Sequence, residues 1–367
     1  MRLPLAVAGN APRGFLDEFG YLHFDGGWRV EWWVGGEDHW HVPASAASRR
    51  QRVVGNTPVV ETVIRVPGGD VAWRAAAAAT GEGGAVAIEF ENTATIPVAL
   101  GIALITPTDL AAPLGRPALH FTAPARSVAA DGGVELLVHP VSHGSTWRAS
   151  IGPTPPASLP PVEAIVRGWQ AFTRQGASVS TGDASMDDAL ATARTSLLLH
   201  AATLRAPRDR LRGAAVANAL TYLGYEDEAE ALRVASRLRP QRRGLPLVSH
   251  PHAAYNPDAL RMLEDPVAAA ATVSAIRRAL VDDKQRGVID LLPSANASLR
   301  GRSVDIANLP TNFGPVSFAL RWHGEKPALL WEAPPARRRR ARITLRASAL
   351  DPEWSTTDQA GEALLRG

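Results

Sequence analysis

The segment WRVEWWV, residues 28–34, decides how the first part of this chain folds. Apolar side chains such as Trp32 alternate in it with polar ones such as Glu31. Successive side chains of a β-strand point to opposite faces, so this alternation predicts a half-buried strand. The same pattern returns in residues 60–66 and 86–90, with turn residues between the runs. Many short strands at this spacing, without a helical period between them, predict an antiparallel β-sandwich.

Composition limits the classes of protein that this chain can belong to. Its 367 residues exceed a single ordinary core and predict two or three domains. The absence of cysteine excludes disulfides, thiolate metal sites and a cysteine nucleophile. A net charge of +3 is nearly balanced, and the arginine cluster at residues 337–342 reads as a solvated turn, so no nucleic-acid partner is expected. No apolar run is long enough for a membrane span, and the short apolar start at residues 3–8 reads as a strand, which predicts a cytoplasmic protein with no membrane partner.

The order of patterns predicts four segments. Residues 1–152 form the β-sandwich domain, and residues 153–166, with five prolines before Val162, form an extended linker. Residues 167–286 carry helical periodicity. Residues 287–367 return to alternating strands and form a C-terminal β-module with a polar tail.

Helix boundaries in the third segment follow from local chemistry. Ser185 and Asp188 have the spacing of a capping box, which predicts a helix start. Gly224 follows a periodic run and predicts a helix end. Asp265 before Pro266 predicts an N-cap and the first residue of another helix.

Several motifs resemble a known group of enzymes. The RD pair in PRDR and the stretch AAVANALTYLGYEDEAEA are similar to a signature of glucoamylase-like and trehalase-like glycosidases, the (α/α)6-toroid or six-hairpin enzymes. A C-terminal group of motifs is similar to their terminal β-module. The stretch GWRVEWWVGGEDHWHVP and the later PVVETVIRVPGGD resemble uncharacterised actinobacterial proteins of the same arrangement. In sequence order these motifs are residues 27–43, 58–70, 207–210, 214–231, 291–293, 313–318 and 321–324.

The resemblance implies both a fold and a function. The fold would be multidomain α and β, with an N-terminal antiparallel β-sandwich, a partial α/α toroid of helical hairpins and a small C-terminal β-module. The toroid would be truncated, because about 125 residues hold roughly half of twelve helices at about 11–12 residues each plus turns. The implied function is a carbohydrate-active, glycoside hydrolase-like protein that acts on or binds an oligosaccharide or polysaccharide. The alternative is a non-catalytic sugar-binding or scaffolding protein, and uncovered helix faces would favour a homodimer.

Site residues follow from the resemblance and from side-chain chemistry. The resemblance implies that Arg208 and Asp209 bind sugar hydroxyls. Glycosidic cleavage requires a pair of carboxylic groups, for which Asp209 and Glu264 are candidates, although both also suit structural roles at helix ends. Indoles stack on sugar faces, and polar loop side chains can line a cleft. The predicted substrate-binding set is therefore Arg208, Asp209, His250, His252, Tyr255 and Trp40, with no metal and no cofactor expected.

One short segment stays open at the level of sequence. Glu37, Asp38, His39 and His41 surround Trp40 between two turn residues. They can face a ligand or serve the turn itself, and the structural role in the turn is the favoured interpretation.

Overall fold

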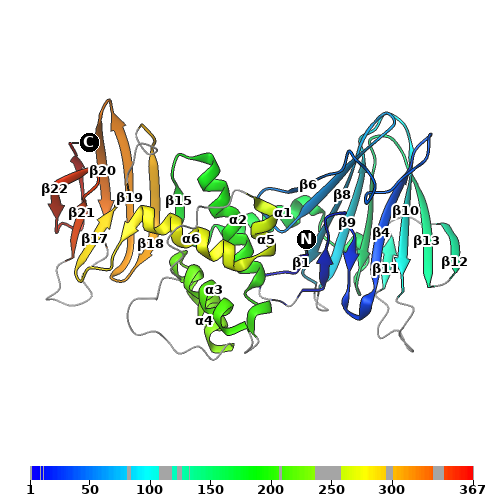
Figure 1. Cartoon of the computed structure of the whole chain (residues 1–367), viewed down its shortest axis with the longest axis horizontal. Coiled ribbons are helices and arrows are strands. Elements are labelled where there is room, and N and C mark those ends of the chain that lie inside the picture. Colours follow the sequence, from blue (N-terminus) through cyan, green and yellow to red (C-terminus); the bar gives the residue numbers. More distant parts are fainter. Residues whose placement is uncertain are drawn as a thin grey trace. The chain divides into compact units, whose positions relative to one another are not determined.

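The chain divides into two compact units (Figure 1), which we call unit 1 (residues 1–170) and unit 2 (residues 171–367). The structure is a computed structural model. It describes residues 2–8, 10, 12–80, 84–106, 118–121, 126–131, 133–205, 209–235, 258–294, 301–333 and 343–366.

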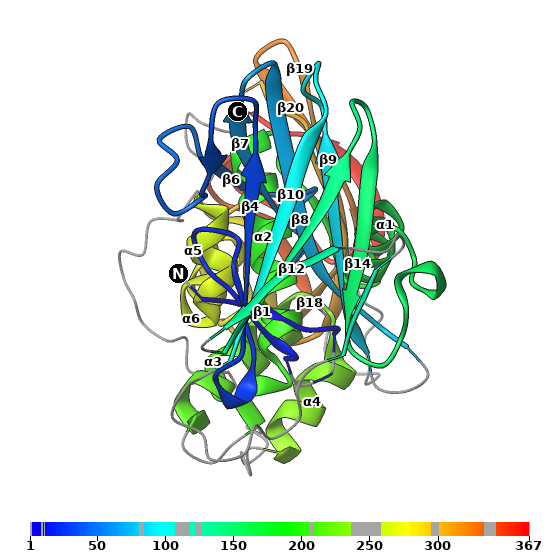
Figure 2. The ribbon, with the colours of Figure 1, turned by 90° about the vertical axis from the view of Figure 1, so that its right-hand side faces the viewer.

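Unit 1 contains two antiparallel sheets. Sheet A has the strand order β1-β2-β3-β4-β10-β13-β12, with β5 paired to β4, and sheet B has the order β11-β14-β9-β8-β7-β6. Neighbouring strands β4 and β10 of sheet A lie side by side in Figure 2. The strands are β1 (Leu3–Leu5), β2 (Gly14–Leu16), β3 (Leu22–His23), β4 (Arg29–Gly35), β5 (Trp40–His41), β6 (Arg50–Val53), β7 (Val60–Val66), β8 (Gly69–Ala78), β9 (Ala85–Asn92), β10 (Val98–Ile105), β11 (Leu119–Phe121), β12 (Arg126–Asp131), β13 (Val134–Val141) and β14 (Thr146–Ile151), with the 3-10 turns η1 (Asp25–Gly27) and η2 (Pro156–Ser158).

The core of unit 1 lies between the two sheets. Trp32 of β4 and Trp73 of β8 are fully buried, and their rings stack with centroids 5.3 Å apart and planes 3° from parallel. Phe90 of β9 meets Trp32 edge-on at 6.2 Å. Every second residue of β4 is buried, so the strand predicted from the alternation in residues 28–34 is confirmed. Large aromatic groups from both sheets thus fill the interior and hold the sheets together.

Helix α1 (Val162–Thr173) begins on a buried carboxylate of sheet B. Its apolar stripe of Val162, Ile165 and Trp169 is buried. The backbone N–H of Val162 donates to Oε1 of Glu89 at 3.0 Å, and Nε of Arg148 lies 3.1 Å from the same oxygen. A carboxylate at this position satisfies one of the free N–H groups of the first helical turn and opposes the positive end of the helix dipole. The predicted linker, residues 153–166, therefore contains η2 and the first residues of α1.

A buried glutamate in sheet B is held between two arginines. Glu61 accepts hydrogen bonds of 2.6 Å from Nε of Arg52 and 2.6 Å from Nε of Arg74, while its side chain is 4% exposed. Burial by itself would raise the pKa of Glu61, but the bonds from Arg52 and Arg74 outweigh it and lower the pKa. The carboxylate is therefore more favourable in the folded than in the unfolded chain.

This arrangement predicts acid sensitivity of unit 1. A carboxyl with a lower pKa when folded binds fewer protons in the folded state, so its stabilising contribution is present above the unfolded pKa of 4.5. It is lost as pH falls from about 4.5 through the lower folded pKa. We expect Glu61→Gln to flatten the decrease of unfolding free energy between pH 5 and 3, measured by urea denaturation. The exposed Glu37→Gln is the control, and an equal slope in both variants would contradict the prediction.

The described residues of unit 2 form five further helices and two sheets. Sheet C has the order β15-β18-β19-β20-β23, and sheet D has the order β16-β17-β21-β22, in which β17 and β21 are parallel. None of the helices in the described parts of the chain combines the length and apolar composition that a membrane crossing requires. The elements are β15 (Ser178–Ser180), α2 (Ala184–His200), η3 (Thr203–Arg205), α3 (Arg210–Tyr222), α4 (Glu226–Ala235), α5 (Ala259–Glu264), α6 (Pro266–Leu280), β16 (Val281–Asp282), β17 (Val288–Leu291), β18 (Val304–Thr311), β19 (Gly314–His323), β20 (Lys326–Glu332), β21 (Thr344–Ala347), β22 (Asp351–Thr356) and β23 (Ala360–Leu364).

The predicted toroid of helical hairpins is wrong. The fold is mostly β, with 40% of residues in strands, 28% in helices and six helices in the part of the chain that the structure describes. Helix α6 packs against both α2 and α3 and then runs directly into β16. A toroid needs successive hairpins around a ring, whereas these helices form one cluster that continues into a sheet. The six-hairpin, α/α-toroid fold that the resemblance implied is therefore not the fold of this chain.

A buried ion pair joins α6 to the β18–β19 hairpin. Nη2 of Arg277 lies 3.0 Å from Oδ2 of Asp283, and their side chains are 10% and 5% exposed. The same carboxylate oxygen accepts the backbone N–H of Asn312 at 2.6 Å. The Arg277 guanidinium also lies over the Tyr222 ring, 4.6 Å from its centroid, and donates to the carbonyl of Pro310. This network connects the helix to the hairpin through the buried charges of Arg277 and Asp283, so each of these two groups depends on the other.

Candidate ligand site on the β4–β5 hairpin

The structure describes three of the seven predicted site residues, Asp209, Glu264 and Trp40. Arg208, His250, His252 and Tyr255 lie outside the residues that the structure describes. Asp209 and Glu264 belong to unit 2, and Trp40 belongs to β5 in unit 1.

The two predicted catalytic acids lie at helix ends. Asp209 is the N-cap residue of α3, although its side chain makes no capping hydrogen bond there. Glu264 is the last residue of α5 and directly precedes Asp265, whose side chain caps α6 through the N–H of Val267 at 2.9 Å. Such positions suit acids for structural reasons alone, and catalysis by Asp209 or Glu264 stays a prediction.

The segment left open by the sequence forms a short hairpin loop. Strands β4 and β5 pair with Val34 opposite His41 and Gly35 opposite Trp40. The N–H of Gly36 donates to the carbonyl of His39 at 3.0 Å and closes the turn. The backbone therefore places the polar residues of the loop on a framework that continues into sheet A.

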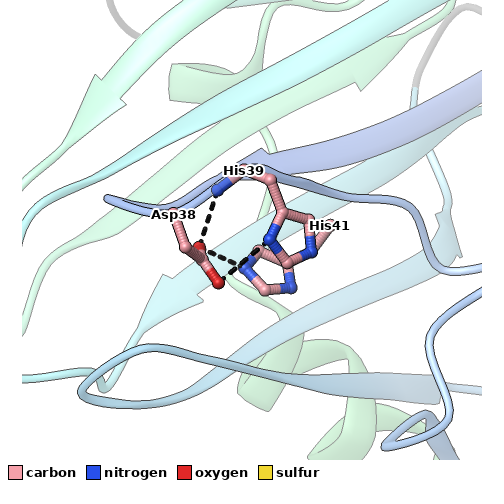
Figure 3. A group of neighbouring side chains, drawn as sticks. All are labelled: Asp38, His39 and His41. Carbon is pink, nitrogen blue, oxygen red and sulfur yellow. Dashed lines mark hydrogen bonds and ion pairs between the residues drawn. The ribbon is translucent and has the colours of Figure 1, made fainter.

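Asp38, His39 and His41, which we call the hairpin trio, converge at this turn (Figure 3). Oδ1 of Asp38 is 2.9 Å from Nε2 of His41, and Oδ2 is 3.0 Å from Nδ1 of His39. The imidazole centroids are 4.1 Å apart. The Asp38 carboxylate thus bridges two imidazoles, and its Oδ1 also accepts the N–H of His39 at 2.8 Å.

The three side chains of the hairpin trio differ in their exposure to solvent. The His41 side chain is 14% exposed, that of Asp38 42% and that of His39 65%. Desolvation would raise the pKa of Asp38, but hydrogen bonds from His41 and from the backbone N–H of His39 outweigh it and lower the pKa. The carboxylate is ionised at neutral pH and can accept further hydrogen bonds or bind a cation.

Gly36 makes room for the trio. A Cβ at this position would lie 2.7 Å from Oδ1 of Asp38, 3.2 Å from Nε2 of His41 and 3.2 Å from Cδ of Pro67. Any side chain here would displace the carboxylate or the buried imidazole. The arrangement consequently requires glycine at residue 36.

Trp40 lies between His39 and His41 along the chain, and its side chain packs on two further glycines. It is 46% exposed, the highest value among the tryptophans of the described residues. Its Cζ3 atom would be 3.3 Å from a Cβ on Gly35 and 3.0 Å from a Cβ on Gly101 of β10. The benzo edge of the indole thus rests on sheet backbone, and nearly half of the side chain remains open to solvent.

A groove on sheet C is the second candidate, in unit 2. It has a volume of about 440 Å³ and is lined chiefly by small or apolar residues of the sheet. Two acidic residues, Asp305 and Glu332, also line it. Asp305 is already paired with Arg321 at 2.5 Å. The groove lacks the converging polar atoms of the hairpin trio, so the hairpin is the stronger candidate for ligand chemistry.

Sequence reasoning found the trio's residues but not their convergence. The signal was the spacing of Asp38, His39 and His41 within four residues. The spacing does not show the register in which β4 pairs with β5, which brings the loop residues together. It also does not show that the absence of a side chain at Gly36 leaves space for them. No protein-family model matches this chain, and no similar curated protein is found.

Proposed function

We propose that this protein binds carbohydrate, without cleaving it, at the β4–β5 hairpin, where the indole of Trp40 is the stacking surface. The observation that carries the proposal is the exposed, backbone-supported indole of Trp40, in a hairpin whose loop also carries the exposed polar groups of Asp38 and His39. The C–H face of a sugar ring packs on an aromatic surface, while its hydroxyls require hydrogen-bonding partners at the rim.

The fixed position of the Trp40 indole supports its role as a binding surface. A tryptophan that rests on Gly35 and Gly101 loses little further freedom when a ligand covers it. Isolated exposed apolar residues are common on proteins, but Trp40 differs in being held against the backbone of the sheet. Asp38 can accept a sugar hydroxyl, and His39 can donate or accept one.

We favour binding over hydrolysis because the hairpin trio contains a single carboxylate. Cleavage of a glycosidic bond generally requires two carboxylic groups about 5–9.5 Å apart across the bond. The hairpin trio contains one carboxylate, and the acids predicted for catalysis lie at helix ends in unit 2. We therefore propose an oligosaccharide or polysaccharide as the ligand, and binding without hydrolysis as the function.

The test is a comparison of variants on a glycan panel. We expect an α- or β-linked oligosaccharide to bind with a Kd that rises roughly tenfold in Trp40→Ala, equivalent to about 1.4 kcal/mol, and less in Trp40→Phe, which keeps an aromatic face. Titration calorimetry measures the affinity. Leu330→Ala, which removes a 40% exposed apolar side chain of unit 2, is the control and should bind as the unmodified protein does.

Two results would overturn the proposal. One is equal glycan affinity in Trp40→Ala and the unmodified protein, or no binding to any glycan at millimolar concentration. The other is release of reducing sugar above the buffer rate, which would replace binding by catalysis. Circular dichroism and melting temperature confirm that each variant is folded.

A further inference from the structure

We propose that Asp38, His39 and His41 form a binding site for a divalent transition metal of the zinc class. This inference goes beyond carbohydrate binding and does not depend on it. Two imidazole nitrogens and a carboxylate oxygen lie within 4.8 Å of one another. Imidazole with carboxylate favours zinc and its neighbours, whereas calcium and magnesium prefer an all-oxygen shell.

The interatomic distances are close to those of a metal shell. Zinc binds nitrogen at about 2.0–2.1 Å and carboxylate oxygen at about 2.0–2.2 Å, so tetrahedral ligand atoms are roughly 3.3 Å apart. The two contacts of Asp38 with the imidazoles measure 2.9 and 3.0 Å. A metal would replace the protons now shared in these contacts, and each imidazole nitrogen would have to move only a few tenths of an ångström from the Asp38 oxygen that it now contacts.

The ligand atoms are identified by the same contacts. Nδ1 of His39 and Nε2 of His41 are the nitrogens that face the carboxylate. The two imidazoles lie on the same side of the loop, with centroids 4.1 Å apart. Both can therefore direct a lone pair at one ion while Asp38 supplies the third ligand (Figure 3).

The protein holds these ligands before any ion arrives. His41 is mostly buried and belongs to a strand paired with β4. The space above Gly36 accepts the carboxylate and the imidazole together. Preorganised ligands lose less conformational freedom on binding, which raises affinity for an ion.

Three protein ligands leave one coordination position open. His39 is 65% exposed, so the open position faces solvent and can hold water or an oxygen of a ligand. A divalent ion bound by one carboxylate and two neutral imidazoles keeps a net charge of +1. An open site of this kind differs from a closed structural zinc site, which has four protein ligands.

The competing explanation is that Asp38 only orients two histidines by hydrogen bonds. The chain contains a matched pair for this case, because Oδ2 of Asp17 lies 2.8 Å from Nε2 of His23 in the same unit. That pair lacks a second imidazole. If pairing alone caused metal binding, His23→Ala would weaken it as much as a change in the trio.

The experiment is a zinc titration of the full, untagged chain after treatment with a chelator. We expect one zinc ion per chain, a melting temperature that rises with zinc, and the absorption of tetrahedral cobalt when Co²⁺ is used instead. His41→Ala should weaken zinc binding at least 100-fold, and the isosteric Asp38→Asn at least tenfold. His23→Ala should bind zinc unchanged.

The outcomes separate this inference from the proposed function. Trp40→Ala should keep zinc binding while it loses glycan affinity. Measurement of glycan binding in chelator-treated protein then shows whether glycan binding requires the metal. No zinc binding at 100 µM, or equal binding in Asp38→Asn and unmodified protein, would overturn the metal site. Asp38→Asn changes an exposed residue without changing its shape, so the test holds even if His41→Ala fails to fold.

Discussion

Asp283→Ala is expected to destabilise unit 2 by about 3–5 kcal/mol, because it leaves the Arg277 guanidinium buried without its anion. It also removes the acceptor of the Asn312 N–H. Urea denaturation of the full chain measures the loss. Hydrogen exchange at the amides of α6 and of the β18–β19 hairpin shows where it occurs.

Two further variants identify the cause. The double substitution Arg277→Met with Asp283→Leu removes both charges together and should recover most of the lost stability, since apolar groups of similar volume often replace a buried pair at little cost. Glu353→Ala breaks the exposed pair with Arg366, whose side chains are both 72% exposed, and should change stability by less than about 1 kcal/mol. Equal losses in Asp283→Ala and Glu353→Ala would contradict this account.

Trp73→Ala is expected to destabilise unit 1 by about 3–5 kcal/mol, because it removes a fully buried indole from the stack between the two sheets. Trp73→Phe should lose less. The smaller ring keeps most of the apolar contact, and the indole Nε1 that it removes has no hydrogen-bond partner among the described residues. Thermal denaturation followed by far-ultraviolet circular dichroism measures both.

The control for this prediction is a tryptophan outside the core. Trp40→Ala removes a side chain of the same type from the surface and should change the melting temperature little. If Trp73→Ala and Trp40→Ala lower the melting temperature equally, the stack is not what holds the two sheets together.

The strands and several helix ends could be predicted from local sequence. The alternation in residues 28–34 depends only on the geometry of one strand. Asp265 with Pro266 and the left-handed Gly224, with φ of 84°, act on adjacent backbone groups, and both were predicted correctly. One cap was misassigned, because Asp183 rather than Ser185 accepts the first N–H groups of α2.

The packing of the helices could not be predicted in the same way. A periodic apolar face shows that a helix is buried on one side, but not which partner covers it. Helix α2 is buried on most of its circumference, with residues such as Leu190, Thr192, Ser196 and Leu199 all inaccessible. Its pattern therefore fitted a toroid and a compact cluster equally well, and the resemblance led to the wrong choice between them.

By itself, the sequence determined where strands and helix caps form and which polar residues lie close along the chain, because those features depend on neighbours within a few residues. Tertiary structure alone decided that Asp38, His39 and His41 share one point in space and that Trp40 stays exposed. Those outcomes need the pairing of β4 with β5 and the glycine of β10 beneath the indole. The physical reason is that convergence of side chains is set by strand register and by space left by distant residues, and neither is encoded in the spacing of the residues that converge.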